Sequence, residues 1–465
     1  MKFAVYFGNR GFFPGELIAS AISDFKEALA ANGHEAIVME GRGTRYDAVE
    51  TPEEGRKFAA FLKEHEGEYG GIILSLPNFG DENGALAALG DVKVPILVQA
   101  YPDEIGSMDF AHRRDSVCGK LAMCNVLRQA GIRHSLTTRF AATPGSESFA
   151  RDLGRFASIC GVANGMRRVS IGVLGARTTA FKTVRVDEIA LQRAGVNVET
   201  IDLSVVLGMM DDADPAKVAE KKALYLGRFE YPAERFGEAK MEALARFGVA
   251  LDELVVRFSL DALAVRCWDE LERRHGIAPC LAMAVLNGAG IPAACETDVA
   301  NAVAMRAVQL ACGGPVAVFD VNNNYGDAED RAIMFHCSAV PGEMLSCKGC
   351  IGEHAMFRKA IGPETGVGVV FGGVKEGPVT LASLKTEDGR LCAFVTEGEV
   401  TGDPIEKEFF GTGFVFRKDG GNIDGMLNYM AENGYRHHVA FAFGRRADAI
   451  AEALGKYRGY DVEKV

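Results

Sequence analysis

The stretch CLAMAVLNGAGIPAACETDVANAVAMRAVQLACGGPVAVFDVNNNYGDAEDRAIMFHCS, residues 280–338, organises this chain. Two carboxylates follow apolar runs in it: Glu296 comes after IPAAC, and Asp320 ends GGPVAVFD. His336 ends a third apolar run, AIMF. Side chains at strand ends meet at one edge of an α/β sheet, and carboxylates with an imidazole are ligands that suit Mn²⁺ or Mg²⁺. The stretch therefore predicts a metal site.

The composition is that of a globular protein of two to four domains, with 465 residues, 48% hydrophobic and 25% charged. A net charge of −12 argues against nucleic acid as the main partner. The start, MKFAVYFGNRG, becomes polar too soon for a signal peptide, and no uncharged apolar run of membrane-spanning length occurs. The 11 cysteines have no framework spacing, so we expect reduced thiols and a cytoplasmic location.

The pattern of apolar runs predicts two consecutive open-sheet α/β domains, followed by a β-rich, barrel-like C-terminal domain. Strand-like runs alternate with helical spacing over residues 1–166, and a new start at RRVSIGVLGAR opens a second α/β domain over residues 167–340. There, FKTVRVDEIALQRAG, residues 181–195, is expected to form one helix. Short alternating runs broken by Gly and Asp-Gly indicate antiparallel strands over residues 341–465, with a closing helix, AIAEALGKYRGY.

Two further patterns have weak chemical meaning. GVLGAR and GNRGFFPG follow strands, but neither has the spacing of a dinucleotide or phosphate loop. Cys347 and Cys350 form a CxxC that Cys337 and His354 would complete as a zinc site. A lone CxxC is expected by chance among 11 cysteines, so we favour the interpretation without zinc.

Each candidate ligand also has a structural interpretation. Glu296 could cap the helix that follows it, and Asp320 could simply end a strand. His437 and His438 precede VAFAFG, which is typical of a strand entering the core. Since neighbouring side chains of a regular strand point to opposite faces, only one of this pair is expected to face a metal.

Several segments resemble the L-fucose isomerase/L-arabinose isomerase superfamily. The specific ones are RCWDELERRHGIAPC, GIPAACETD, FDVNNNYGD, FHCS and GYRHHVAFAFG, and the first domain adds SLPNFGDE and DSVCG. The resemblance extends over the whole chain and implies two α/β domains with a β-rich C-terminal domain. It also implies a metal-dependent aldose–ketose isomerase that uses Mn²⁺, with Mg²⁺ or Co²⁺ as alternatives.

By this resemblance, Glu296, Asp320 and His438 match the metal ligands, and the two carboxylates flank the reacting carbons. His336 stands where the arabinose-type members have a fourth ligand, whereas Asp320 is Asp as in the fucose-type members. The resemblance matches Arg10 to an arginine that reaches a neighbouring subunit's substrate, with Glu82 and Arg114 as weaker candidates. It implies a homo-trimer or homo-hexamer in which a neighbouring subunit's first domain covers the site.

The predicted reaction is an ene-diol proton transfer on a free or modified aldose, such as an L-fucose-like or D-arabinose-like sugar. A hexose with an anionic group at C6 is a variant, which additional Arg or Lys residues at the pocket would indicate. Two other classes remain as alternatives, a non-catalytic sugar-binding protein and a nucleotide-dependent oxidoreductase. The second requires a dinucleotide fingerprint, and the sequence contains none.

Overall fold

The computed structural model describes residues 1–406 and 411–465, which divide into two compact units, Met1–Asn164 and Gly165–Val465. Among the described residues, no helix is both long and apolar enough to cross a membrane.

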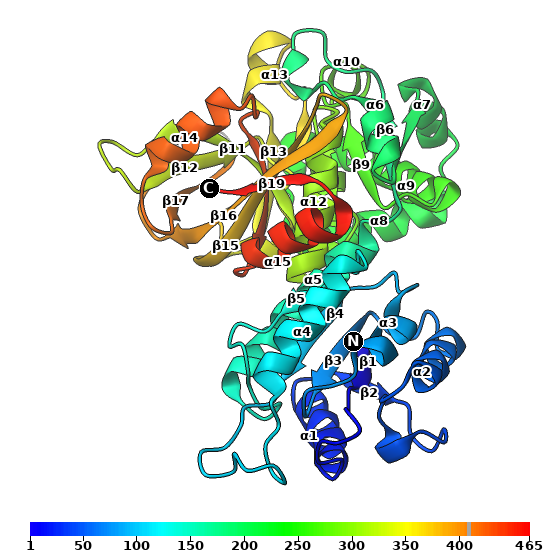
Figure 1. Ribbon diagram of the computed structural model, residues 1–465. Coiled ribbons are helices and arrows are strands. Elements are labelled where there is room, and N and C mark those ends of the chain that lie inside the picture. The colour runs from blue at the N-terminus through cyan, green and yellow to red at the C-terminus, as the bar shows by residue number, and fades with distance from the viewer. Residues whose placement is uncertain (407–410) are drawn as a thin grey trace. The chain divides into compact units, whose positions relative to one another are not determined.

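The first unit is built on a five-stranded parallel sheet in the order β2-β1-β3-β4-β5 (Figure 1). Its central strand, GIILSL, is buried at every position, as a parallel sheet covered on both faces requires. The strands are β1 (Lys2–Phe7), β2 (Glu35–Val38), β3 (Gly71–Leu76), β4 (Ile96–Ala100) and β5 (Ser135–Leu136).

Helices cover both faces of this sheet. One face packs against α2, α3 and α4 around side chains such as Phe58 and Met123, and the other packs against α1 and α5 through rings such as Phe25 and Phe156. The bounds are α1 (Leu17–Ala31), α2 (Pro52–Glu64), α3 (Glu82–Leu89), α4 (Ser116–Gln129) and α5 (Glu147–Gly165).

The second unit contains a four-stranded parallel sheet in the order β10-β9-β6-β7. Its strands are β6 (Val169–Leu174), β7 (Val196–Ile201), β9 (Ala262–Val265) and β10 (Ala293–Cys295), and its helices are α6 (Glu188–Arg193), α7 (Leu203–Asp211), α8 (Pro215–Arg228), α9 (Ala233–Phe258), α10 (Glu270–His275), α11 (Cys280–Gly288) and α12 (Val299–Cys312).

The single helix expected over residues 181–195 is wrong in its first half. That half forms a loop with a short 3-10 turn, Lys182–Val184, and α6 begins only after Asp187. The Asp187 carboxylate accepts hydrogen bonds from the backbone N–H groups of Ile189 and Ala190 at 2.9 and 3.0 Å. This N-cap fixes the start of the helix, because it satisfies N–H groups that have no partner within the helix.

A ring of six strands completes the fold and confirms the barrel-like prediction. The order is β15-β18-β11-β12-β17-β16, and β16 pairs back with β15 to close the ring. Strand β19 (Asp461–Lys464), which the sequence pattern did not predict, pairs parallel with β16. The ring strands are β11 (Ala317–Asn324), β12 (Arg331–His336), β15 (Gly377–Glu387), β16 (Arg390–Thr401), β17 (Thr412–Lys418) and β18 (His438–Phe443).

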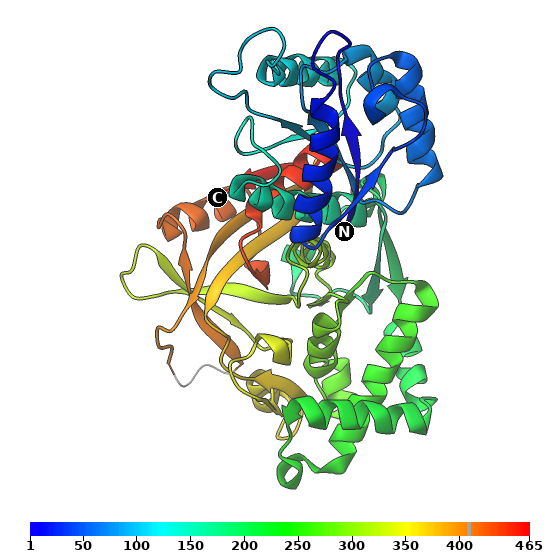
Figure 2. The ribbon, with the colours of Figure 1, turned by 90° about the horizontal axis from the view of Figure 1, so that it is seen from below.

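Helix α12 connects this ring with the parallel sheet. It packs against β9, β15 and β18, and most of its residues are buried. Figure 2 views this helix nearly along its axis, beside the ring strands. Strands β11 and β12 precede residue 340 yet belong to the ring, so the predicted domain boundary there falls between strands of one sheet.

Smaller elements complete the unit. A three-stranded sheet joins β8 (Phe229–Glu230), β13 (Gly349–Glu353) and β14 (Val367–Phe371), and the remaining helices are α13 (Ala355–Ala360), α14 (Ile423–Glu432) and α15 (Ala447–Glu452).

Candidate metal centre

Glu296 leaves the short strand β10 in an unusual backbone conformation. Its φ is 61° and that of Thr297 is 57°, both in the left-handed region that side chains other than Gly seldom adopt. The turn places the Glu296 carboxylate 3.0 Å from Nε2 of His438, and the residue is 7% exposed. The alternative role as a helix cap is wrong: Asp298 caps α12, because its carboxylate accepts a hydrogen bond from the Asn301 N–H at 3.0 Å.

Asp320 and His438 are direct cross-strand partners in the ring. Strands β11 and β18 run antiparallel with these two residues opposite each other, so their side chains share a face. Oδ1 of Asp320 lies 3.5 Å from Nε2 of His438. Asp320 lies within its strand rather than at its end, since β11 continues to Asn324.

His336 joins these residues from β12, the strand next to β11. It is 2% exposed, and its ring centroid lies 5.9 Å from that of His438. One ligand atom each from Glu296, His336 and His438 falls within 4.8 Å of the others, as do those of Asp320, His437 and His438. His438 is common to both groups, so all four predicted ligands converge there.

His437 also faces this site, which the strand argument excluded. Strand β18 begins at His438, and His437 lies in the bend before it. The alternation of side chains therefore does not apply to this pair. Nε2 of His437 lies 3.8 Å from Oδ1 of Asp320, and its side chain is 42% exposed. The strand begins one residue later than the sequence analysis expected, so His437 lies outside it and its side chain can also reach the site.

A second layer behind His438 consists of Asp298 and Arg436, which the sequence analysis missed. Nδ1 of His438 is 2.9 Å from Oδ2 of Asp298, and Nε of Arg436 is 3.1 Å from the same oxygen. With its Nδ1–H donated to Asp298, His438 presents Nε2 to Glu296 and Asp320, as a metal ligand does. The only sequence signals are an Asp two residues after one ligand and an Arg two residues before another.

The electrostatics of this cluster favour positive charge beside its carboxylates. Burial alone would lower the pKa of His438, but the carboxylates of Asp298 and Glu296 raise it to about 10. Burial opposes ionisation of Glu296, yet His438 and the nearby imidazoles hold the pKa of its carboxyl below the usual value. In the described part of the chain, Oδ1 of Asp320 and Nε2 of His438 are buried without a well-formed hydrogen bond. Two unsatisfied ligand atoms among carboxylates fit a divalent metal ion.

Aromatic rings line the same site. The Phe181 ring lies 5.7 Å from that of His437, 5.6 Å from that of His438 and 5.9 Å from that of Trp268, measured between centroids. Phe181 belongs to the loop that follows β6, so the carboxyl edge of the parallel sheet forms one wall.

Buried cysteines lie behind Glu296. Sγ of Cys295 is 3.2 Å from Sγ of Cys267, and burial raises the pKa of the Cys267 thiol to about 12. In the part of the chain that the structure describes, the set considered for zinc is not among the clusters whose ligand atoms converge. Cys337 instead lies 3.5 Å from Nδ1 of His336, whereas Cys347 is exposed.

In the first unit, Arg10, Glu82 and Arg114 lie in loops and a helix start at the carboxyl edge of its sheet. Nη2 of Arg10 is 3.6 Å from Oε1 of Glu82, its Nε donates to the Gly80 carbonyl at 3.0 Å, and its guanidinium covers the Phe79 ring at 4.1 Å. Arg114 donates to the Pro77 carbonyl at 3.0 Å. The three side chains therefore gather near one loop, residues 77–82.

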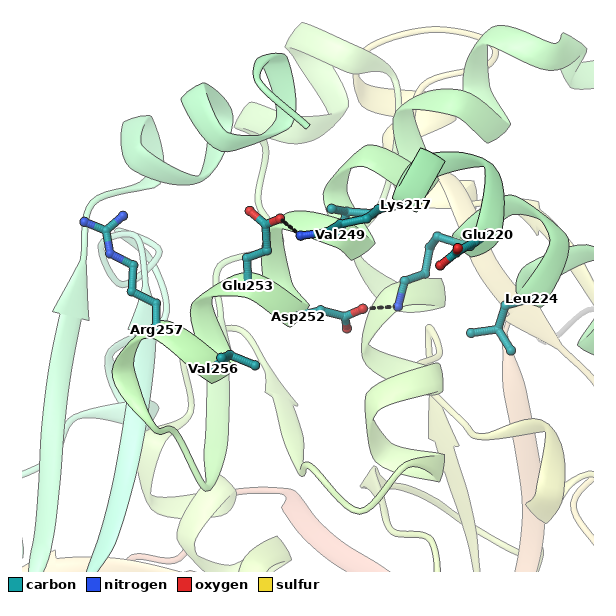
Figure 3. A pocket seen from close by; sticks show the side chains of 9 residues that line it. Lys217, Glu220, Leu224, Val249, Asp252, Glu253, Val256 and Arg257 are labelled. Atoms are coloured by element: carbon teal, nitrogen blue, oxygen red, sulfur yellow. Dashed lines mark hydrogen bonds and ion pairs between the residues drawn. The ribbon is translucent and has the colours of Figure 1, made fainter. Parts of the chain in front are cut away.

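A surface hollow of about 580 Å³ lies elsewhere in the second unit, between α8 and α9 (Figure 3). Its charged walls are largely satisfied: Lys217 pairs with Glu253 at 2.8 Å, and Lys221 pairs with Asp252. None of the candidate ligands lines this hollow.

The sequence also matches known families and is similar to known proteins. Residues 4–167 match the family described as fucose/sulfoquinovose isomerase, N-terminal domain, and residues 334–465 match L-fucose isomerase, C-terminal domain. The chain is similar to the sulfoquinovose isomerase of Alkalicoccus urumqiensis, at 24% identity over 410 residues that cover 84% of this chain and 86% of the relative. The sulfoquinovose isomerase of Priestia aryabhattai is 24% identical over 393 residues, which cover 83% of each chain.

Proposed function

The chain belongs to the fucose isomerase-like family of aldose–ketose isomerases, and from this premise we propose that it isomerises a hexose with an anionic group at C6, such as sulfoquinovose, with a bound divalent metal ion. The observation that carries the metal requirement is the convergence of Glu296, Asp320 and His336 on His438, with unsatisfied ligand atoms on Asp320 and His438. The substrate class rests on the relatives, which are named sulfoquinovose isomerases.

The chain's own residues would hold the ion and move the proton. Glu296, Asp320 and His438 would bind it, with His336 as a fourth ligand. When bound, Mn²⁺ or a similar ion polarises the substrate carbonyl and stabilises negative charge on oxygen. Asp298 accepts a hydrogen bond from Nδ1 of His438, so Nε2 faces the carboxylates and would bind the ion once the ion displaces its proton.

The proton transfer falls to a carboxylate of the pair. Glu296 or Asp320 takes the proton from C2 of the open-chain aldose, the electrons of the C2–H bond form the C1=C2 double bond, and O1 takes up a proton as its bond to C1 becomes single, which gives the ene-diol. The proton then returns to C1 as O2 loses its proton, which leaves the ketose. General acid–base catalysis of this kind contributes about 10²–10⁴ in rate. A lowered pKa keeps Glu296 ionised and ready to accept a proton at neutral pH.

The proposal includes an oligomer, because residues of the first unit are expected to reach the substrate of another subunit. We infer a homo-oligomer in which Arg10 and its neighbours Glu82 and Arg114 cover the substrate of an adjacent subunit. A variant Arg10→Ala and a variant Glu296→Gln would each be inactive alone but would restore part of the activity when their subunits are mixed. Mixed oligomers that stay inactive would place Arg10 outside the shared site.

One experiment tests the central proposal. The protein is treated with EDTA, Mn²⁺ is restored, and sulfoquinovose and neutral aldoses are followed by NMR in D₂O. We expect ketose formation only with the metal, deuterium incorporated next to the carbonyl, and loss of turnover in Glu296→Gln. The exposed Glu432→Gln in α14 is the matched control. Turnover that survives both EDTA and Glu296→Gln would refute the metal-dependent mechanism, and turnover without deuterium uptake would favour a hydride shift.

A further inference from the structure

We propose that Arg266, Trp268 and the loop of residues 175–187 form the subsite that binds the anionic C6 group of the substrate. This inference rests on the proposed function, and it assigns to particular residues the specificity that the proposed function requires. These residues come from the ends of β9 and β6, at the carboxyl edge of the four-stranded sheet, where ligands bind in open α/β folds.

The loop of residues 175–187 has a net positive charge, whereas the whole chain has a net negative charge. Its sequence, GARTTAFKTVRVD, contains Arg177, Lys182 and Arg185, which are exposed. The one acidic residue, Asp187, is engaged as the cap of α6. With a net charge of −12, the protein as a whole repels an anionic sugar, so a local concentration of cations beside the site has a steering effect.

Phe181 places this loop beside the metal centre. Its ring contacts the imidazoles of His437 and His438 on one side and the indole of Trp268 on another, at 5.6–5.9 Å between centroids. A hexose with C1 and C2 at the ligands extends its C6 away from them. The Phe181 ring is a neighbour of both the histidines and Trp268, so Trp268 lies close to the metal centre.

Two hydrogen-bond donors near Phe181 are without partners. Nε1 of Trp268 and Oγ1 of Thr178 are buried and make no hydrogen bond in the part of the chain that the structure describes. Thr178 and Phe181 belong to one turn, since the Phe181 N–H donates to the Thr178 carbonyl at 3.0 Å. An indole N–H can only donate. A buried donor without an acceptor is costly, which points to an acceptor supplied by a ligand.

Arg266 adds a fixed guanidinium to these donors. Its backbone N–H donates to the Leu174 carbonyl at 3.0 Å, and its Nε donates to the Trp268 carbonyl at 2.7 Å. A Cβ on Gly175 would approach the side chain of Arg266 to 3.2 Å, so this Gly lets the arginine stem pack against the loop. The Nε bond holds the guanidinium in place against the Trp268 backbone.

The chemistry of these groups matches a sulfonate. A sulfonate is a permanent anion with three acceptor oxygens and no donor, and a guanidinium presents donors in a planar fork that suits such groups. A methyl group in place of the sulfonate-bearing carbon would leave the buried donors unpaired, and a hydroxymethyl group would offer them only one uncharged acceptor oxygen. Sites built to satisfy polar groups reject analogues that lack them far more strongly than apolar pockets reject a missing methylene.

The test compares two sugars on the manganese-loaded full-length protein. The kcat/KM is measured for sulfoquinovose and for its neutral counterpart 6-deoxyglucose, in the wild type, Arg266→Gln and Trp268→Phe. A lost charged hydrogen bond corresponds to roughly 10- to 100-fold. We expect Arg266→Gln to lower the preference for sulfoquinovose by at least about tenfold, mainly through KM, and Trp268→Phe to lower it less. The control is Arg274→Gln, an exposed arginine of α10 paired with Glu270 at 2.9 Å.

A binding measurement gives a readout without turnover. The sulfonated alditol obtained by reducing sulfoquinovose cannot isomerise, and calorimetry should show weaker binding to Arg266→Gln than to the control. Equal losses for both sugars, or unchanged alditol binding, would overturn the subsite while metal-dependent turnover of the wild type stands. A wild type that converts no aldose with Mn²⁺ would instead refute the proposed function, and the subsite with it.

Discussion

Replacing Asp298 with Asn tests whether the second layer positions His438. Asn keeps the shape and the ability to cap α12, but it removes the charge that faces His438 Nδ1 and Arg436 Nε at 2.9 and 3.1 Å. Loss of such a partner of a metal-binding His typically weakens metal affinity by about 10- to 100-fold. We expect a weakening of this size for Mn²⁺.

The same change has a separate cost in stability. Breaking a buried ion pair leaves an unpaired charge and costs about 3–5 kcal/mol. Arg436 keeps its hydrogen bond to the Leu384 carbonyl at 2.6 Å, which lowers our expectation to about 2–3 kcal/mol. The melting temperature of the metal-free protein should therefore fall as well.

The assay is calorimetric titration of the EDTA-treated protein with Mn²⁺, alongside its thermal unfolding. Asp152→Asn is the matched control, because Asp152 is equally buried and accepts from the Thr138 N–H at 3.0 Å in the other unit. That control should lose stability but keep its Mn²⁺ affinity. If Asp298→Asn binds Mn²⁺ within about threefold of the wild type, well short of the expected weakening, Asp298 does not position the ligand.

Three further predictions follow from the same structure. Removing metal with EDTA should lower the melting temperature, and Mn²⁺ at 100 times its Kd should restore about 2.7 kcal/mol of stability. A melting temperature that does not change when Mn²⁺ is added would contradict the proposed metal site. His438→Gln should abolish Mn²⁺ binding, whereas His437→Gln should retain it within about tenfold, since only His438 is buried and held by Asp298. Equal losses of Mn²⁺ affinity in the two variants would show instead that both imidazoles contribute equally to metal binding. Burial raises the pKa of Glu272 to about 8, above its unfolded value of 4.5, so the native state keeps a proton that the unfolded state releases between these pH values. The wild type therefore has the full contribution of this group to its stability below pH 4.5 and loses that contribution by about pH 8. Glu272→Gln cannot ionise, so its melting temperature should exceed that of the wild type by an increasing margin from about pH 5 to about pH 8. A difference in melting temperature that stays constant over this pH range would refute the prediction.

The sequence predicted the architecture because its apolar periodicity is strong. Alternating strands and helices indicated the α/β parts, and the Gly-punctuated runs after residue 365 indicated the ring. Strand β19 escaped because its four residues, DVEK, have almost no apolar pattern. The helix at 181–195 was extended too far, since the N-cap role of Asp187 depends on backbone geometry rather than on periodicity.

The candidate ligands were predicted from the family resemblance and from their positions after apolar runs, but the residues that surround them were not predicted. The sequence analysis gave Asp298 no role, and its bond to His438 joins residues 140 positions apart. No local pattern carries that information. His437 was excluded because the strand was expected to include it, and a shift of one residue reverses this kind of inference.

Strand β18 lies between β15 and β11 in the ring, although it follows both in the chain. During synthesis the other ligand-bearing elements emerge first, and a gap must stay open in the sheet until His438 and its strand arrive. A chain interrupted before that point has neither a closed ring nor the imidazole that lies beside the carboxylates. If the proposed metal site is correct, metal retention would report that a molecule has been made and folded through to its late strands, and it would separate finished protein from truncated copies.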